Sequence, residues 1–212
     1  MRTNPFSDAI GFLTQPNWTT LFFWLLLIAS IAIAAFNLRR DETQRAEVHL
    51  WQWLLRVLIG SMWWVQSLWK MPPTFTDRAD GTGGLMFWVN EMAKHAAFEV
   101  QADFVKNVFQ PNFFFFALQV YLIEVFIAVS LILGLFSRLG AFLGVLMGIN
   151  LWLGLYRHPA EWPWNYIFLI VVHAMFTIHV VGRSLGVDAM LVRRPAPGGG
   201  EGWGSRVLRY VS

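Results

Sequence analysis

The chain has 212 residues, of which 56% are hydrophobic, including 12 Trp and 19 Phe, and only 14% are charged. A soluble domain of this length does not need so large an apolar fraction to build its core. The absence of Cys excludes disulfides, thiolate metal sites, covalently attached haem and iron–sulfur clusters within this chain. The net charge of +3 comes from scattered basic residues, so no nucleic-acid partner is expected. Composition therefore predicts an all-α integral membrane protein surrounded by a lipid bilayer.

Five segments are long and apolar enough to form transmembrane helices, which need about 20 residues each. They cover residues 19–38, 51–69, 112–135, 139–156 and 162–181. The second and fifth segments are less apolar than the others, because they contain Arg56 and two histidines. The first resembles a secretory signal, but the polar residues before it and the Arg39-Arg40 pair after it favour an uncleaved helix.

Basic residues predict the orientation of these helices, because Lys and Arg accumulate on the inner side of a membrane. With the N-terminus outside and the C-terminus inside, the inner side receives Arg39, Arg40, Arg45, Arg138, Arg183, Arg193, Arg194, Arg206 and Arg209. We therefore predict five spans in the cytoplasmic membrane of a bacterium or an archaeon. Residues 1–49 carry the first span, residues 50–191 carry the other four, and residues 192–212 form a flexible basic cytoplasmic tail.

The loop predicted on the outer side, residues 70–111, contains one helical pattern. Between residues 85 and 97 the apolar residues recur at helical spacing, with charged residues on the opposite side. The apolar face consists of Leu85, Val89, Met92, Ala93 and Ala96, and the polar face of Glu91, Lys94 and His95. We expect a helix that lies on the membrane surface or caps the bundle.

Glu124 is the most unusual residue of the third apolar segment, because it lies about 11 residues from either end. Asn150 and His173 fall at nearly the same depth of their own segments, given a rise of about 1.5 Å per residue. An ionisable group at such a depth marks a functional site or a buried polar contact. One hypothesis is a Glu124–His173–Asn150 cluster in which Glu124 and His173 handle protons. The alternative is a protonated Glu124 that holds neighbouring helices together.

The second apolar segment carries a stripe that we expect to face the bundle, formed by Arg56, Gly60, Trp63, Ser67 and Lys70. Two roles are open for Arg56. Its side chain extends to the inner membrane surface, or it pairs with an acidic residue or binds the head group of a quinone or an anionic lipid. The candidate head-group site comprises Arg56, Trp63 and Asn150.

The histidines do not predict a metal or haem site. His173 and His179 are six residues apart, which places them about 120° apart around a helix, so they cannot easily share one ion. The remaining histidines, His49, His95 and His158, lie near the membrane surfaces, so no partner for a haem b ligand is expected.

A glycine ridge in the fourth segment, Gly140, Gly144 and Gly148, predicts close approach of a neighbouring helix. This pattern is typical of helix packing and carries no chemistry of its own.

Three short motifs occur in order along these segments. The first runs from Arg56-Val-Leu-Ile-Gly60 to Lys70, and the second joins Glu124 to Gly134-Leu-Phe-Ser-Arg138. The third is Gly182-Arg183-Ser-Leu-Gly186-Val-Asp188. Together they resemble the DoxX/DoxD family, and most of all the DoxD-type small subunit of thiosulfate:quinone oxidoreductase. The resemblance implies a four-helix transmembrane bundle, extended here by one N-terminal helix, which works with other membrane subunits in quinone reduction.

Two functions follow from these patterns. The chain is a DoxD-like subunit that passes electrons to a quinone, with Glu124 and His173 as the proton-handling residues. Alternatively, it is a non-catalytic accessory or scaffold subunit of a larger respiratory or photosynthetic membrane complex. The buried charge favours the first function, and the absence of a redox ligand set favours the second.

Overall fold

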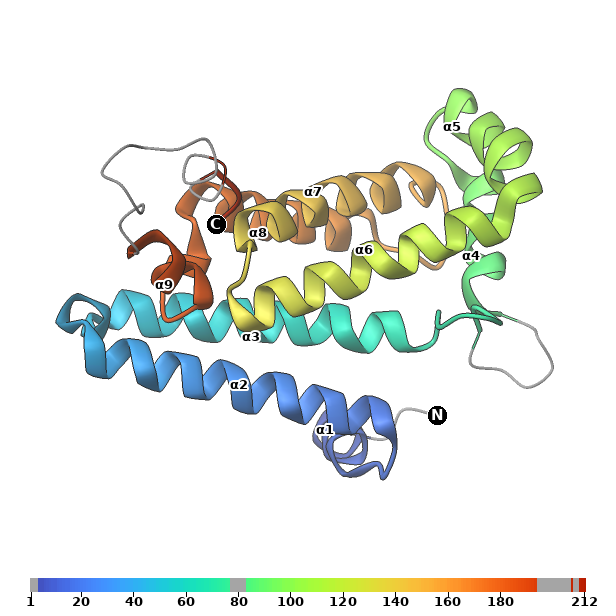
Figure 1. Ribbon diagram of the computed structural model, residues 1–212. Coiled ribbons are helices and arrows are strands. Elements are labelled where there is room, and N and C mark those ends of the chain that lie inside the picture. The colour runs from blue at the N-terminus through green and yellow to red at the C-terminus, as the bar shows by residue number, and fades with distance from the viewer. Residues whose placement is uncertain (1–3, 77–82, 194–206, 208–209) are drawn as a thin grey trace.

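The computed structural model describes residues 4–76, 83–193, 207 and 210–212, and in these residues all regular structure is helical (Figure 1). Three helices are long and apolar enough to cross a membrane: α2 (Trp18–Arg40), the continuous helix Glu99–Leu133, and α7 (Ser137–Gly154). A fourth apolar helix, α8 (Pro163–His179), is shorter at 17 residues. The prediction of an all-α protein with several membrane-spanning helices is confirmed in this form.

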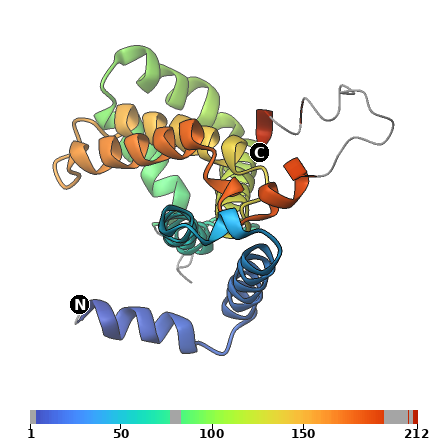
Figure 2. The same cartoon turned by 90° about the vertical axis from the view of Figure 1, so that its left-hand side faces the viewer.

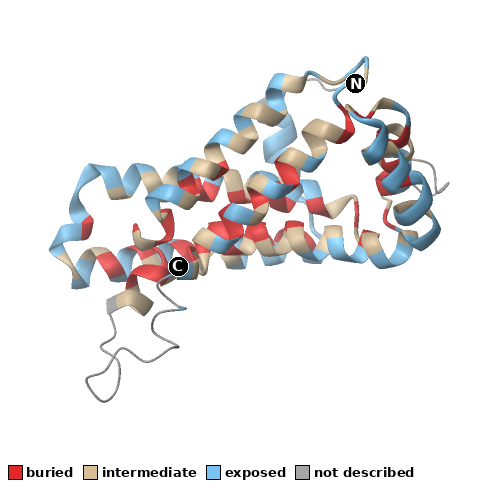
Figure 3. Ribbon diagram, turned by 90° about the horizontal axis from the view of Figure 1, so that it is seen from above, coloured by how far each residue is buried: buried red, intermediate tan, exposed pale blue. Residues whose placement is uncertain are grey.

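Four helices form the main bundle, namely α3 (Glu47–Leu68), α6 (Phe113–Leu133), α7 and α8. The closest pairs are α7 with α8 and α3 with α6, and α6 also packs on α7. Helix α2 lies along α3 and α6 on one side of this bundle (Figures 1 and 2). Buried residues concentrate where these helices face one another, whereas their outer faces are exposed (Figure 3).

The predicted glycine ridge of α7 allows its close contact with α6 and α8. A Cβ atom on Gly144 would lie 2.0 Å from the His173 ring, and one on Gly148 would lie 2.8 Å from the Ile170 side chain. On Gly140 it would meet the Ser130 hydroxyl of α6 at 2.2 Å. These distances are too short for any side chain, so the ridge serves packing, as the sequence predicts.

Helix α2 is fixed to the bundle by polar contacts as well as by apolar packing. The Ser30 hydroxyl donates a hydrogen bond of 2.6 Å to the carbonyl oxygen of Ile132 in α6. The Asn37 amide donates one of 3.1 Å to the carbonyl oxygen of Gly186. Both side chains are fully buried. The N-terminal helix that the sequence places outside the four-helix unit is therefore an integral part of this fold.

The segment before α2 forms a helix that the sequence analysis missed. Helix α1 (Pro5–Thr14) starts at an Asn4 cap and is joined to α2, where Trp24 donates a 2.9 Å hydrogen bond to the Leu13 carbonyl oxygen. Figure 2 shows α1 extending away from the bundle. At 10 residues this helix is too short to cross a membrane, so a search for transmembrane segments passes over it.

At one end of the bundle, helix α4 (Gly84–His95) covers the ends of the main helices (Figure 1). Its buried side chains, Leu85, Val89, Met92 and Ala93, are those predicted from the sequence. The capping prediction is thus confirmed, and Met92 packs directly on Gly154 of α7.

The predicted loop 70–111 extends too far along the chain. Helix α5 (Glu99–Phe104), a π turn (Val105–Phe109) and a 3-10 turn (Gln110–Asn112) continue directly into α6. Pro111 lies in the 3-10 turn, where its missing N–H group interrupts the α-helical pattern without ending the helix. The proline suggested a helix start at Asn112, whereas the structure has one helical run from Glu99.

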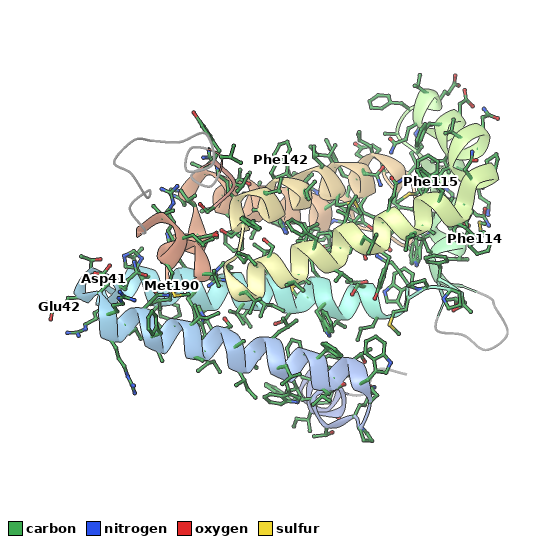
Figure 4. All side chains as sticks on the ribbon, in the orientation of Figure 1. Asp41, Glu42, Phe114, Phe115, Phe142 and Met190 are labelled. Atoms are coloured by element: carbon green, nitrogen blue, oxygen red, sulfur yellow. The ribbon has the colours of Figure 1, made fainter. Side chains whose placement is uncertain are left out.

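The outer faces of the helices carry large apolar side chains. Phe114 and Phe115 of α6 and Phe142 of α7 are 71%, 64% and 48% exposed, and Figure 4 shows them on the outside of the bundle. The charged residues Asp41 and Glu42 lie at the tip of the α2–α3 hairpin, at the opposite end from Phe114 (Figure 4). This distribution suits a protein whose helices contact lipid and whose connections contact water.

The chain after α8 forms a 3-10 turn (Val181–Arg183) and helix α9 (Val187–Arg193) beside the α6–α7 turn. The predicted flexible tail, residues 192–212, falls mostly outside the described residues.

Candidate functional site

A cavity of about 620 Å³ lies within the bundle at the α4 end. Its walls come from α3, α6, α7 and α8, and α4 contributes Leu85, Trp88, Val89 and Met92. Five aromatic side chains line it: Trp63, Trp69, Trp88, Phe109 and Tyr166. A concave, largely aromatic site of this volume is typical of small-molecule binding.

A buried ion pair forms one wall of this cavity. Lys70, two residues after the end of α3, donates a hydrogen bond to Oε1 of Glu124 near the middle of α6. Lys70 is only 7% exposed and Glu124 only 1%. The Lys70 ammonium also lies 4.5 Å from the centre of the Trp69 ring, a distance that suits a cation–π contact.

The second carboxylate oxygen of Glu124 is left open. Oε2 is buried and has no hydrogen-bond partner among the described residues. A buried charged oxygen without a partner is costly, since its lost hydration is not replaced. Because Glu124 lines the cavity, a ligand or water molecule there has a ready acceptor.

Further polar side chains surround the same space. Gln66, Asn150, Glu161 and Asn165 line the cavity. The Tyr166 hydroxyl donates a 2.8 Å hydrogen bond to Glu161, which orients the phenol at the wall. The cavity therefore combines a few polar groups with broad aromatic surfaces.

The structure corrects the proposed Glu124–His173–Asn150 cluster. Glu124 and Asn150 both line the cavity, but His173 does not. The partner of Glu124 is Lys70. The rotation of α8, which the sequence does not reveal, turns His173 away from the cavity.

His173 is a buried core histidine with both ring nitrogens engaged. Its Nδ1 donates to the carbonyl oxygen of Leu169 at 2.8 Å, and its Nε2 accepts from Trp63 Nε1 at 2.9 Å. These two bonds define a neutral imidazole with its proton on Nδ1. Since Trp63 lines the cavity, His173 acts here by holding that indole in place.

The structure also corrects the expectations for Arg56. Its side chain does not extend to the surface but is fully buried, and Nη1 donates to the carbonyl oxygens of Leu131 and Ile132. Arg56 does not line the cavity. Seven residues separate it from Trp63 along α3, about 10 Å of helix, and only Trp63 lines the cavity, so Arg56 and Trp63 do not share one head-group site. The predicted stripe itself is confirmed, because all five of its residues are buried.

Five of the motif residues that carry the family resemblance meet around the α6–α7 turn, at the opposite end from the cavity. We name Arg56, Gly134, Ser137, Gly182 and Asp188 the turn cluster. Asp188 accepts hydrogen bonds from the backbone N–H groups of Phe136 and Ser137 at 2.8 and 2.9 Å, and from the Ser137 hydroxyl at 2.7 Å. It thereby caps the start of α7 from a distant part of the chain.

The glycines of the turn cluster provide space for these contacts. Gly134 ends α6 in the left-handed conformation (φ +66°), and a Cβ atom there would lie 2.7 Å from Arg56 Nη1. A Cβ atom on Gly182 would lie 2.2 Å from the Asp188 carboxylate. Of the other motif residues, Arg183 donates a 3.3 Å hydrogen bond to the Ser212 carbonyl oxygen, and Arg138 is only partly buried. In the structure the residues of the turn cluster organise packing.

Sequence reasoning missed Lys70 as a site residue. It belonged to the predicted stripe and to the first motif, but its position at the end of the segment suggested a residue in contact with water. The sequence did contain one indication: Lys70 belongs to the stripe that was predicted to face the bundle, as Arg56 does. Its 54-residue separation from Glu124 gives no local pattern.

A second group of chemically active side chains lies beside the cavity, outside the membrane-spanning helices. Glu91 and His95 of α4 and His158 of the α7–α8 loop place one potential metal-ligating atom each within 4.8 Å of one another. The Lys94 ammonium, 2.7 Å from Glu91 Oε1, holds the pKa of Glu91 below its usual value. The Glu91 side chain is therefore a carboxylate at neutral pH.

No family model, no curated protein and no solved structure matches this chain. The fold and the site define a multi-pass, all-helical membrane protein whose internal cavity is mainly apolar and carries a few polar groups.

Proposed function

We propose that the cavity binds a quinone head group and that the chain is the membrane subunit of a quinone-linked oxidoreductase of the thiosulfate:quinone type. The observation that carries this proposal is the buried Lys70–Glu124 pair in the cavity wall, with Glu124 Oε2 unpaired among the described residues. A pair that served packing alone would not need an adjoining space. The family resemblance of the sequence supports the same function.

A quinone head group fits the chemistry of this cavity. It is a flat ring with two carbonyl oxygens, so it needs aromatic surfaces to stack on and donors to bond its oxygens. Trp63, Trp88 and Tyr166 supply the surfaces. The Lys70 ammonium has donors beyond the one used by Glu124 and binds one carbonyl oxygen.

Reduction of the quinone consumes two electrons and two protons. In the proposed reaction two thiosulfate ions give up one electron each and combine as tetrathionate. Glu124 and Lys70 both line the cavity, and we assign to Glu124 the delivery of a proton, received from the Lys70 ammonium, to a quinone oxygen. His173 keeps Trp63 in place and transfers no proton to the quinone. The cations at the α4 end, Lys94, Lys106 and Arg157, attract the oxyanion donor.

The proposal includes a topology. We place α2, α3, α6, α7 and α8 across the cytoplasmic membrane of a bacterium or an archaeon, with the N-terminus and the α4 end outside. The described arginines of the opposite end, Arg39, Arg40, Arg45 and Arg183, support an inner location for the turn cluster.

The native absence of Cys makes the topology simple to test. Glu42→Cys, at the α2–α3 hairpin, and Glu99→Cys, at the start of α5, both replace exposed glutamates. In intact cells a membrane-impermeant maleimide should label only the Glu99→Cys variant, and it should label both variants after lysis. Labelling of Glu42→Cys in intact cells would overturn the orientation.

Quinone binding is tested on the purified full-length chain with a short-chain soluble quinone. Three tryptophans line the cavity, so binding should quench tryptophan fluorescence in a saturable manner. Glu124→Gln should weaken binding at least tenfold, because it removes the charge partner of Lys70. The control Glu47→Gln alters an exposed glutamate at the start of α3 and should bind like the wild type.

Catalysis is tested with thiosulfate as the electron donor and the same quinone. Quinone binding without turnover in the isolated chain, and turnover with a co-purified subunit, would support the subunit assignment. No saturable quenching in the wild type would overturn the proposal. Stoichiometric recovery with a larger complex and no quinone binding would instead establish the accessory function.

A further inference from the structure

We infer that Glu91, His95 and His158 form a binding site for one divalent transition-metal ion, which ties α4 to the α7–α8 loop. The inference does not depend on the quinone proposal. Two histidines and one carboxylate are the ligand set of many zinc sites and of non-haem iron sites.

The spacing of the ligand atoms fits such an ion. Nε2 of His95 and Nε2 of His158 each lie 3.3 Å from Oε2 of Glu91. Ligand atoms about 2.05 Å from a tetrahedral Zn²⁺ ion are separated by about 3.3 Å. All three atoms lie within 4.8 Å of one another, so an ion can bind them with small side-chain movements.

The backbone holds the three residues in this arrangement. Glu91 and His95 are four residues apart on α4 and therefore share one face. His158 comes from the loop, which is joined to the end of α4 by a 3.0 Å hydrogen bond from the Arg157 N–H to the His95 carbonyl oxygen. The Arg157 guanidinium donates a second bond, of 3.0 Å, to the Ala97 carbonyl oxygen.

Neighbouring side chains support metal binding. Lys94 occupies Oε1 of Glu91, which leaves Oε2 directed toward both imidazoles. His95 is 28% exposed and gives an ion access from solvent, whereas His158 is 10% exposed and packs against Trp88. Three protein ligands leave a fourth position for water or a small anion.

One contact must change when the ion binds. The Ala160 N–H donates a long 3.3 Å hydrogen bond to Nδ1 of His158, which places the ring proton on Nε2. When a metal binds Nε2, the ring proton must be on Nδ1. Nδ1 can then no longer accept a hydrogen bond from Ala160, so this bond is lost. Because Trp88 lines the cavity and contacts His158, the ion would fix the helix that covers the quinone-sized space.

The test uses the full-length protein, purified through a tag without histidine and stripped with a chelator. Titration with Co²⁺ should give the visible absorption of a tetrahedral site, saturating at one ion per chain, and Zn²⁺ should displace it. Glu91→Gln, His95→Ala and His158→Ala should each weaken binding by at least about a hundredfold, more than second-shell changes do. Glu91→Asp, which keeps a carboxylate, should retain part of the affinity.

Two control variants and a stability measurement complete the test. His179→Ala and Glu99→Gln remove an exposed histidine and an exposed glutamate outside the cluster and should bind Co²⁺ like the wild type. Zn²⁺ at about 100 times its Kd should raise the thermal midpoint of the wild type by roughly 5 °C, but not that of His158→Ala. Equal binding in all variants, or no tetrahedral Co²⁺ spectrum, would overturn the inference. Either result leaves the quinone assay with Glu124→Gln unaffected.

Discussion

The two ends of the bundle both bury charged side chains, but they differ in what surrounds those side chains. In the turn cluster, Asp188 accepts three hydrogen bonds, and glycines fit against Arg56 and Asp188 so closely that a Cβ atom would clash. At the α4 end, Lys70 and Glu124 face a cavity of about 620 Å³. Burial of a charge is therefore not enough to mark a functional site. A buried charge next to a cavity is a much stronger indication, whereas an unpaired atom does not separate the two ends, because Arg56 Nε and Nη2 are also buried without a partner among the described residues.

The largest expected effect of a substitution is at the turn cluster. Asp188→Ala removes three hydrogen bonds and the acid that faces the buried Arg56 guanidinium. We expect a loss of about 5 kcal/mol or more in the free energy of unfolding, seen as poor yield and early thermal unfolding in detergent. Asp103→Ala, at an exposed position of α5, should unfold like the wild type. A stable Asp188→Ala protein would show that this end does not determine the fold.

The ion pair of the α4 end should behave differently. Lys70→Met alone leaves Glu124 buried without its charge partner and should cost about 3–5 kcal/mol. The double variant Lys70→Met/Glu124→Leu removes both charges and should recover most of this stability, since apolar replacements of a buried pair are often neutral. Quinone binding should stay lost in the double variant. Recovery of both stability and binding would mean that the pair has no role in ligand recognition.

The next largest loss of stability is expected at the contact between α7 and α8. Gly144→Ala places a methyl group 2.0 Å from the His173 ring, and overpacking of this kind costs about 1–3 kcal/mol. Gly11→Ala in α1 meets nothing within 4 Å and should be neutral or slightly stabilising, because Ala favours a helix. Thermal unfolding of both variants in one detergent measures the difference. Equal midpoints would contradict the close packing of α7 on α8.

The smallest expected effect concerns the wall of the cavity. Trp63→Phe removes the donor to His173 Nε2 and should cost about 1 kcal/mol in the free energy of unfolding. Trp64→Phe is the matched control, because Trp64 Nε1 is buried with no partner among the described residues, and it should cost less. If His173 serves to hold Trp63, His173→Ala and Trp63→Phe should weaken quinone binding to a similar extent. A much larger effect of His173→Ala would restore a direct role for this histidine.

Much of the fold follows from composition and periodicity. The apolar segments, the arc of α4 and the glycine ridge each depend on a repeating local pattern, so the sequence predicts them well. The helical run from Glu99 through Pro111 was missed, because a single proline looks the same at a helix start and inside a π or 3-10 turn. Helix α1 was missed because it is too short, at 10 residues, to span a membrane.

The site was harder to predict than the fold. Depth along a helix can be counted from the sequence, and it predicted Glu124 near the middle of its helix, where the structure has it. Rotation about the helix axis cannot be counted in the same way for α6 and α8, whose polar residues are too few to define a face. For this reason the sequence paired Glu124 with His173, whereas the fold pairs it with Lys70.

Helix α2 limits how far the chain can be shortened from its N-terminus. The Ile132 carbonyl oxygen, in the last turn of α6, accepts from both Ser30 of α2 and Arg56 of α3. Helix termini in an apolar surrounding have no water to complete their hydrogen bonds. A truncated protein that starts after Asp41 would therefore expose part of the α6 terminus to lipid. The N-terminal helix acts as a covalently attached subunit of the four-helix unit, and a minimal folding unit has to include it.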